Sequence, residues 1–464
     1  MSPLYRVIQD HLESALRAEV HSPEPGENIG EDPASPETVT GHAEEAMRGY
    51  MECGVPRFGM VRYLCRKCGR DILVATSCKR RGACPSCDGK RGAVTTGRAM
   101  EELLPRAPYR QWVLVIPKRL RYHVNRNARL AGEINRILRK TLSDYYRRVC
   151  GQGAEASPAQ IDVLQRFGSS VNLHVHIHSV VSDGVFSPEG ETGVRFYPAV
   201  PISAQDMENL SESIRRKVLR RFRKLGVMDA ETEQSMRVWE HSGFNLNGDV
   251  RVDGEDRAGL ERILGYCLRG AIKLEKMGYD GTRVKYRVEK PGQRGVTLEW
   301  GGEEFVRRWS RLIPPPRQHI VKYGGVLGPR SGMRERVTAA AHEGRSYEDL
   351  LAGRSPSEIG ILARKAVREA GTRVKMYFGT WAACLKRVFE VSPILCEACG
   401  VEMVPVAAIT EDRELERLLN HLGLPTEWPK MKPARSPPVA VGADSQVNPE
   451  AERWDGIDSL SPEE

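Results

Sequence analysis

The stretch VNLHVHIHSVVSDGVF, residues 171–186, decides the fold of the region around it. Its apolar residues and the Ser-Asp-Gly turn near its end predict a β-strand. Successive side chains of a strand point to opposite faces, so His174, His176 and His178 share one face. A lone histidine is more often structural, but three together favour a metal ion as their common partner.

The ligand type narrows the identity of this metal without fixing it. Histidines that leave coordination positions open suit Mg²⁺ or Mn²⁺ bound jointly with a phosphate oxygen. The ion would there act as a Lewis acid on a phosphodiester. Zinc is compatible with the same imidazoles, so all three ions stay as alternatives.

Strands and long helices alternate on both sides of this stretch. The order predicts an α+β fold rather than a doubly wound one. Segments rich in Pro, Gly, Ser and charge predict linkers at 21–40 and 328–357 and a disordered tail beyond 425. Besides 171–186, hydrophobic periodicity predicts strands at 110–117 and 318–323, a hairpin at 284–300, and helices at 1–20, 41–52, 123–150, 203–228 and 255–277.

Length and charge set the broad class. A chain of 464 residues predicts about three domains, and 40% hydrophobic residues allow a sizeable core. The net charge of +9 suits a polyanionic partner, although many basic proteins bind no nucleic acid. The sequence has no run of about 18 apolar residues, so no membrane span is expected, and the N-terminal stretch predicts an amphipathic helix of a cytoplasmic protein.

Cysteine spacing predicts a structural metal site. Cys65 and Cys68 form one C-x2-C pair, and Cys84 and Cys87 form another fifteen residues later. Two such turns can bring four thiolates to the corners of a tetrahedron, which predicts a closed structural zinc site. The alternatives are buried free thiols or a redox pair.

Four other cysteines have less certain roles. Cys78 could replace one of the four thiolates or lie buried beside them, and Cys53 is spare. Cys396 and Cys399 form a third C-x2-C pair with no evident partner ligands, so a packed, metal-free turn is the better interpretation there.

Basic residues cluster along the edge of the cysteine-rich segment. Lys79, Arg80 and Arg81 are the densest group, and we expect them to contact DNA phosphates. A solvated charged face explains the same residues equally well.

Several strings resemble the rolling-circle transposases of the insertion-sequence-91 family, which are HUH nucleases, named for a His–hydrophobic–His motif. The likeness covers about residues 45–425 in order. The strings that carry it are Cys65–Cys68, Ser77–Gly82, Cys84–Cys87, Gln111–Leu114, Gln165–Ser169, Asn172–His178, Asp183–Phe186, Leu264–Arg269, Pro314–Arg317, Tyr323–Leu327, Cys396–Cys399 and Leu422–Pro425.

The resemblance implies an HUH-nuclease core, an antiparallel sheet flanked by helices, preceded by a zinc-binding module with four cysteine ligands. His176 and His178 would be the metal-binding pair on a central strand, and His174 a third ligand or a supporting group. Tyr266 would attack the phosphate and form a 5′-phosphotyrosine, with Arg269 one turn along the helix steadying the charge. Arg166, within one of the matching strings, is a further expected DNA contact. The alternative for Tyr266 is a core or interface tyrosine.

The implied domains and partners follow. Some relatives carry a second tyrosine where this chain has Gly270, so one tyrosine would serve both cleavages, a second subunit would supply another, or activity would be impaired. Single-stranded DNA at transposon ends is the expected partner, and host helicase or replication factors would do any unwinding. Three alternatives are a zinc-dependent DNA-binding regulator without catalysis, an HUH replication initiator or relaxase, and a decayed, inactive transposase copy. The expected division is an N-terminal helix and linker at 1–40, a zinc-binding domain at 41–104, the nuclease core at 105–327, a helical linker with the Cys-pair region at 328–424 and the tail at 425–464.

Overall fold

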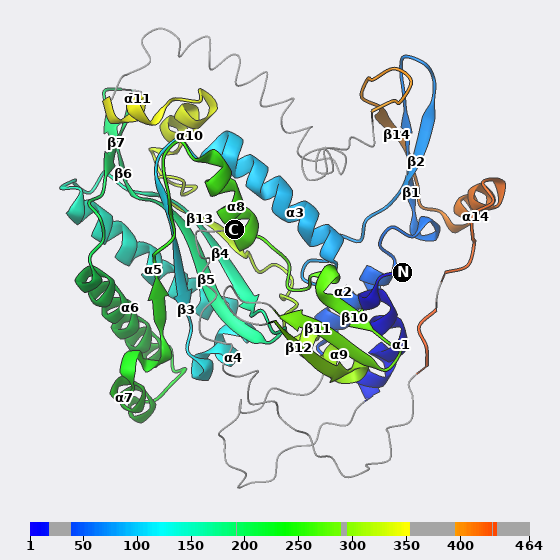
Figure 1. The fold of residues 1–464 in the computed structure, drawn as a ribbon, viewed down its shortest axis with the longest axis horizontal. Helices are drawn as coiled ribbons and strands as arrows, with labels where there is room; N and C mark the ends of the chain where they lie inside the picture. Colours follow the sequence, from blue (N-terminus) through cyan, green and yellow to red (C-terminus); the bar gives the residue numbers. More distant parts are fainter. Residues whose placement is uncertain (18–38, 192, 289–294, 353–394, 429, 434–464) are drawn as a thin grey trace.

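A central antiparallel sheet organises the computed structural model of the protein, which describes residues 1–17, 39–191, 193–288, 295–352, 395–428 and 430–433 (Figure 1). Within these ranges the strand order is β13-β4-β5-β3-β8, with β9 also paired to β3. The histidine strand β5 lies between β4 and β3 and is buried along nearly its whole length, which confirms its predicted central place. The strands are β3 (Tyr109–Val115), β4 (Ala159–Phe167), β5 (Leu173–Ser182), β8 (Asn245–Asn247), β9 (Arg251–Val252) and β13 (Val321–Gly325).

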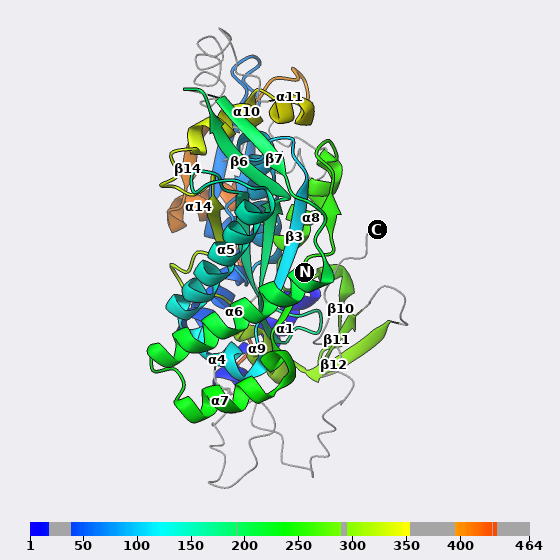
Figure 2. The same cartoon turned by 90° about the vertical axis from the view of Figure 1, so that its left-hand side faces the viewer.

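Helices α5 (Ala128–Val149) and α6 (Ala204–Lys224) cover one face of the sheet, as Figure 2 shows from that side. Apolar side chains of the sheet strands pack against them, among them Trp112, Ile177 and Val181. The predicted helix at 123–150 is wrong as one element, because Asn127 leaves the helical conformation and caps α5 through its side chain. The chain on this side also forms α4 (Lys118–Arg126), α7 (Ala230–Val238) and η3 (Glu240–Gly243).

The opposite face of the sheet carries the second helical layer. The predicted helix at 255–277 is shorter than expected, because its regular part ends at Cys267. The predicted linker at 328–357 is wrong, since two helices form there and bury Val337 and Leu350. The elements of this layer are α3 (Pro85–Arg98), the π-helical turn η2 (Ala99–Leu103), α8 (Arg257–Cys267), α10 (Arg334–His342) and α11 (Tyr347–Ala352), beside the hairpin β6 (Gly184–Glu189) and β7 (Gly193–Pro198).

A separate apolar core forms around α1 (Pro3–Arg17) and α9 (Gly302–Ser310). The helical spacing of Leu4, Ile8 and Leu12 puts these side chains on one fully buried face of α1, as the sequence predicts. The hairpin predicted at 284–300 is present, while the tip of its turn lies outside the described residues. The remaining elements of this unit are α2 (Gly41–Met51), η4 (Leu274–Lys276), β10 (Met277–Tyr279), β11 (Arg283–Val288) and β12 (Val296–Gly301).

The cysteine-rich segment forms a small antiparallel sheet of order β14-β1-β2. The sheet joins segments that are far apart in the chain: β1 (Met60–Leu64), β2 (Asp71–Ala75) and β14 (Val404–Ile409). The helices η1 (Pro56–Phe58) and α14 (Asp412–His421) lie beside it. The tail expected to be disordered beyond 425 is partly ordered, because the backbone N–H of Lys432 donates to the carbonyl of Gln9 on α1 (2.8 Å). The predicted linker at 21–40 and the helical stretch before Cys396 lie mainly outside the described residues.

No helix among the described residues is both long enough and apolar enough to cross a membrane.

Candidate active site and zinc module

The imidazoles of His176 and His178 meet on the α8 face of the sheet. Their Nε2 atoms lie 3.0 Å apart, and both side chains are almost completely buried. Two ligands at right angles around an ion about 2.1 Å away would lie roughly 3.0 Å apart, so the pair fits neighbouring positions of an octahedral ion. The structure therefore brings together the predicted pair in a form that suits a metal.

His174 stands beside this pair without joining it as a third ligand. Its ring packs edge-on against the ring of His176, with centroids 5.0 Å apart. In the described part of the chain, only two cysteine groups bring three or more candidate ligand atoms within 4.8 Å of one another. The arrangement favours the supporting role for His174, because its carbonyl accepts a hydrogen bond from Nδ1 of His176 (2.8 Å).

Neighbouring groups set the protonation of the pair. Burial lowers the pKa of His178 well below its usual range, and nearby His176 and Arg269 add to the effect, so this imidazole is neutral at pH 7. The Gln111 amide lies 2.9 Å from Nδ1 of His178. An amide can present either its NH₂ or its oxygen, so Gln111 can direct the His178 proton to Nδ1 or to Nε2. With the proton on Nδ1, both facing Nε2 atoms are available to a cation.

Tyr266 lies over this pair, near the end of α8. Its ring meets the His178 ring edge-on, with centroids 5.6 Å apart and an interplanar angle of 89°. Gln165, opposite His176 in the sheet, fixes the end of the helix, because its Nε2 donates to the carbonyls of Tyr266 (3.2 Å) and Cys267 (2.7 Å). The histidine strand and the predicted tyrosine are thus held face to face.

Arg269 completes the cluster just beyond the helix. Its guanidinium carbon lies 4.9 Å from the centroid of the Tyr266 ring and 5.2 Å from that of Phe167. Its Nε is buried without a hydrogen-bond partner among the described residues. A positive charge with an unused donor is therefore available beside the tyrosine.

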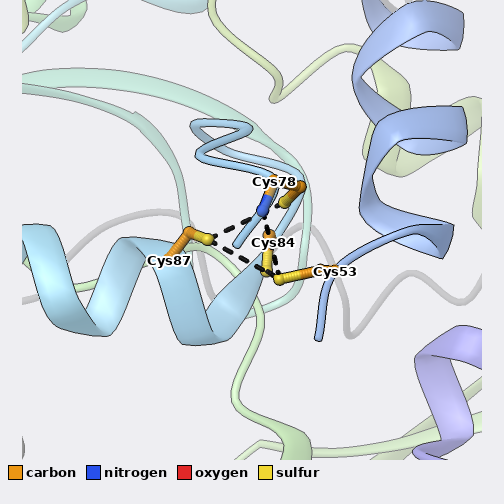
Figure 3. A group of neighbouring side chains, drawn as sticks. All are labelled: Cys53, Cys78, Cys84 and Cys87. Carbon is orange, nitrogen blue, oxygen red and sulfur yellow. Dashed lines mark hydrogen bonds between the residues drawn. The ribbon is translucent and has the colours of Figure 1, made fainter. Parts of the chain in front are cut away.

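Cys53, Cys78, Cys84 and Cys87 form the first cysteine group, with sulfur–sulfur distances of 3.5–3.8 Å between hydrogen-bonded pairs (Figure 3). Four thiolates about 2.3 Å from a tetrahedral zinc ion would lie roughly 3.8 Å apart, so the spacing fits zinc. Cys84 precedes the first turn of α3 and Cys87 lies within it, where the helix N-terminus favours thiolate charge. Pro85 at the first helical position suits this turn.

The predicted partnership of Cys65 and Cys68 with Cys84 and Cys87 is wrong. The first pair lies with Cys396 and Cys399 in a second group, and the second pair closes on Cys53 and Cys78. Two C-x2-C turns can share an ion only where the fold brings them together, and here β1 and β2 carry the first turn away from α3. Cys78 belongs to the first group of four candidate ligands, in line with the alternative that it replaces one of the predicted thiolates.

Three of the basic residues predicted to contact DNA, Lys79, Arg80 and Arg81, border a pocket of about 330 Å³ beside the first cysteine group. Lys79 and Arg317, on its two sides, both have a left-handed backbone (φ 56° and 62°), which is uncommon outside glycine. Arg80 is paired with Glu45 (2.7 Å), and burial lowers the pKa of Arg81. The other residues that line the pocket are His42, Ala46, Arg91, Ile313, Pro314 and Pro316.

Comparison with known proteins identifies the family. The sequence model described as "Putative transposase" matches residues 160–334, and the one described as "Transposase zinc-binding domain", of insertion-sequence-91 type, matches residues 27–116. The chain belongs to this transposase family. "Putative transposase y4qJ" of Sinorhizobium fredii is 24% identical over 335 residues, which is 66% of this chain and 77% of that protein. No solved structure matches the chain.

The matches confirm the expected transposase family and its zinc-binding domain. The first matched segment spans the histidine strand, α8 and β13, and the second spans the first cysteine group and the 65–68 turn.

The role predicted for Arg166 as a DNA contact does not fit the transposase structure. Its side chain is buried, and its donors are used by Asn125 (Oδ1 at 2.7 Å, carbonyl at 2.9 Å) and Gln318 (2.9 Å). Burial and nearby Arg81 lower the pKa of Arg166 to about 9. Arg166 therefore ties β4 to α4 and to the segment before β13.

Sequence reasoning missed three residues of the site. Gln111 and Gln165 carry no motif signal on their own, although both fall within strings that resemble the family. Cys53 was recognised only as a spare cysteine, because its spacing from Cys78 and Cys84 is irregular.

Proposed function

We propose that the transposase nicks and rejoins single-stranded DNA through a phosphotyrosine intermediate, in rolling-circle-like transposition. The observation that supports this most is the edge-on meeting of the Tyr266 ring and the buried His178 ring, 5.6 Å apart. A regulator that only binds DNA would leave the paired imidazoles and the adjoining arginine without a role.

The proposed reaction conserves the energy of the phosphodiester. The Tyr266 oxygen forms a bond to phosphorus, the bond from phosphorus to the 3′ oxygen breaks, and the tyrosine proton passes to solvent. The departing 3′ oxygen takes up a proton and becomes a hydroxyl, while the 5′ phosphate stays on the protein. A 3′-hydroxyl can later attack the phosphotyrosine and restore a phosphodiester without ATP.

A divalent cation, Mg²⁺ or Mn²⁺, would be held by the Nε2 atoms of His176 and His178, which fit such an ion by spacing and by neutrality. When bound, it would supply Lewis-acid polarisation of the phosphate. Arg269 would hold the phosphate oxygens as negative charge builds on them. Gln165 acts as a positioning residue, because it fixes the end of the helix that carries the nucleophile.

Position 270, just beyond α8, bears on how many nucleophilic tyrosines one chain supplies. A Cβ built on Gly270 would lie 3.3 Å from Asp88 at the start of α3. Because the chain has glycine at this position, we infer one tyrosine per chain, which would serve both cleavages in turn or act with a second subunit.

The basic pocket supports single-stranded DNA as the partner. Lys79, Arg81 and Arg317 offer positive charge on its walls, and an acidic neighbour, Glu45, is already paired with Arg80. Phosphate binding there would make affinity fall with salt, and each lost contact would lower the salt slope by about 0.7 for a single strand.

The test uses the full chain with single-stranded DNA from its element's ends and Mn²⁺ or Mg²⁺. A covalent protein–DNA adduct should persist on a denaturing gel and fall at least about 100-fold in Tyr266→Phe. Tyr63→Phe, which alters a partly buried tyrosine on β1, is the matched control and should keep wild-type yield. His176→Ala should lose the response to added metal.

Two results would count against the proposal. An adduct of wild-type yield in Tyr266→Phe would move the nucleophile elsewhere. The absence of an adduct with the wild-type protein on cognate ends would favour a protein that only binds DNA.

A further inference from the structure

Cys65, Cys68, Cys396 and Cys399 form a group that joins distant parts of the chain. Their sulfur atoms all lie within 4.8 Å of one another, and those of Cys68 and Cys396 are 3.5 Å apart. The matched zinc-binding domain ends at residue 116, so it holds only two of these four ligands. Four thiolates at this spacing fit a tetrahedral zinc ion.

The two turns that supply these ligands have the same backbone geometry. The N–H of Gly69 donates to the carbonyl of Cys65 (2.9 Å), and the N–H of Gly400 donates to the carbonyl of Cys396 (2.8 Å). Both glycines have a left-handed backbone (φ 78° and 63°), which other residues rarely adopt.

A second hydrogen bond repeats in each turn. The N–H of Cys65 donates to the carbonyl of Arg70 (2.7 Å), and the N–H of Cys396 donates to that of Val401 (2.9 Å). Two turns with the same sequence of hydrogen bonds thus face each other as knuckles of one site.

The sheet beside the turns joins the same two segments. β14 pairs with β1 from Met60 opposite Ile409 to Leu64 opposite Val404, and β2 pairs with the other edge of β1. Each knuckle therefore opens directly into a strand of one three-stranded sheet, which is the architecture of a zinc ribbon.

The apolar cores around this sheet are very small. One contains the buried residues Cys65, Cys396 and Met403, and the other contains Met60, Leu415 and Leu419. Cores of this size do not stabilise an independent fold, and small domains of this kind usually depend on a metal or a disulfide. A bound metal would supply the missing stabilisation.

We propose that a second structural zinc ion, held by Cys65, Cys68, Cys396 and Cys399, closes a zinc ribbon and fastens the C-terminal strap, residues 395–428 and 430–433, to the zinc module. Four thiolates saturate the ion, so the site is structural and takes no part in DNA cleavage. Beyond the ribbon, the strap contacts η1 and α1. Its Asp412 pairs with Arg57 (2.6 Å), the rings of its Trp428 and of Phe58 are 5.2 Å apart, and its Lys432 reaches Asp10 on α1 (2.8 Å).

Metal content of the purified full-length protein tests the proposal. We expect two zinc ions per chain in the wild type and one in the double variant Cys396→Ser/Cys399→Ser. The single variant Cys399→His should keep both ions, because imidazole can replace a thiolate. Cys53→Ser/Cys78→Ser, as the matched control, should lose the ion of the first group instead.

Limited proteolysis tests the fastening. Cleavage within the strap should be at least about 10-fold faster in Cys396→Ser/Cys399→Ser than in the wild type or in Cys399→His. One zinc ion in the wild type, two in the double variant, or an equally protected strap after zinc loss would each overturn the proposal. Because adduct formation at Tyr266 is scored separately, these outcomes are distinguishable from a failure of the nuclease assignment.

Discussion

Replacing Asp183 by alanine should destabilise the transposase more than any loss of a surface ion pair. Its carboxylate accepts hydrogen bonds from Arg110 (3.0 and 3.1 Å), Arg251 (2.7 Å) and the Tyr146 hydroxyl (3.1 Å). The side chains of Asp183 and Arg110 are each only 8% exposed. Burial alone would lower the pKa of Arg110, but Asp183 raises it above its ordinary value, so the guanidinium stays charged.

The magnitude follows from the charge left behind. Without Asp183, Arg110 would stay buried beside β5 and would keep, of its present side-chain hydrogen bonds, the one to the carbonyl of Gly248 (2.7 Å). Removing one partner of a buried pair costs about 3–5 kcal/mol, because the other charge loses both its hydration and its counterion.

Urea unfolding followed by tryptophan fluorescence measures the effect. Trp112 donates to the Tyr146 hydroxyl (3.2 Å) and therefore reports on the affected region. The control is Asp253→Ala, which removes a partner of Arg251 that is 82% exposed and should cost less than about 1 kcal/mol. An Asp183→Ala protein within about 1 kcal/mol of wild type would refute the reasoning.

Three further predictions concern the site, an ion pair and a turn. Gln111→Leu removes the partner of Nδ1 of His178 and should weaken Mn²⁺ binding about 10–100-fold in a calorimetric titration, with the fold intact. Arg221 lowers the pKa of Glu133 to about 2. The ion pair therefore stabilises the protein above pH 4.5, and this stabilisation is lost as the pH falls toward 2. In urea unfolding, Glu133→Gln should cost about 1 kcal/mol at pH 7 and much less near pH 2.5. Gly325 has φ 56°, and a Cβ at this position would collide with the backbone carbonyl of Pro158. Gly325→Ala should therefore cost about 2 kcal/mol or more in urea unfolding. An unchanged urea midpoint would contradict this.

The central strand and its histidines were predictable because a strand repeats every two residues. The alternation at residues 174–178 fixes which side chains share a face, whatever the rest of the chain does. The position of Tyr266 over that face could be expected only from the family resemblance, because α8 is placed by packing between distant segments. Its hydrogen bonds with Gln165 leave no trace in local spacing.

The grouping of the cysteines could not be predicted from their local spacing in the sequence. A C-x2-C spacing indicates that its two thiolates bind one ion, but not which second pair completes the site. Cys84 and Cys87 follow Cys65 and Cys68 closely, yet their partners are Cys53 and Cys78, because α3 and the end of α2 meet there. The second group forms because β14 pairs with β1, and these two strands are more than 300 residues apart in the sequence.

The order of these ligands along the chain has a consequence during synthesis. All four cysteines of the first group have been made once Cys87 is complete, whereas the turn at Cys65 and Cys68 must wait for Cys399. At roughly 5–20 residues per second, the wait of about 300 residues lasts roughly 15–60 s. In the proposed ribbon, a nascent chain therefore presents only the Cys65 and Cys68 half of the second site during this time.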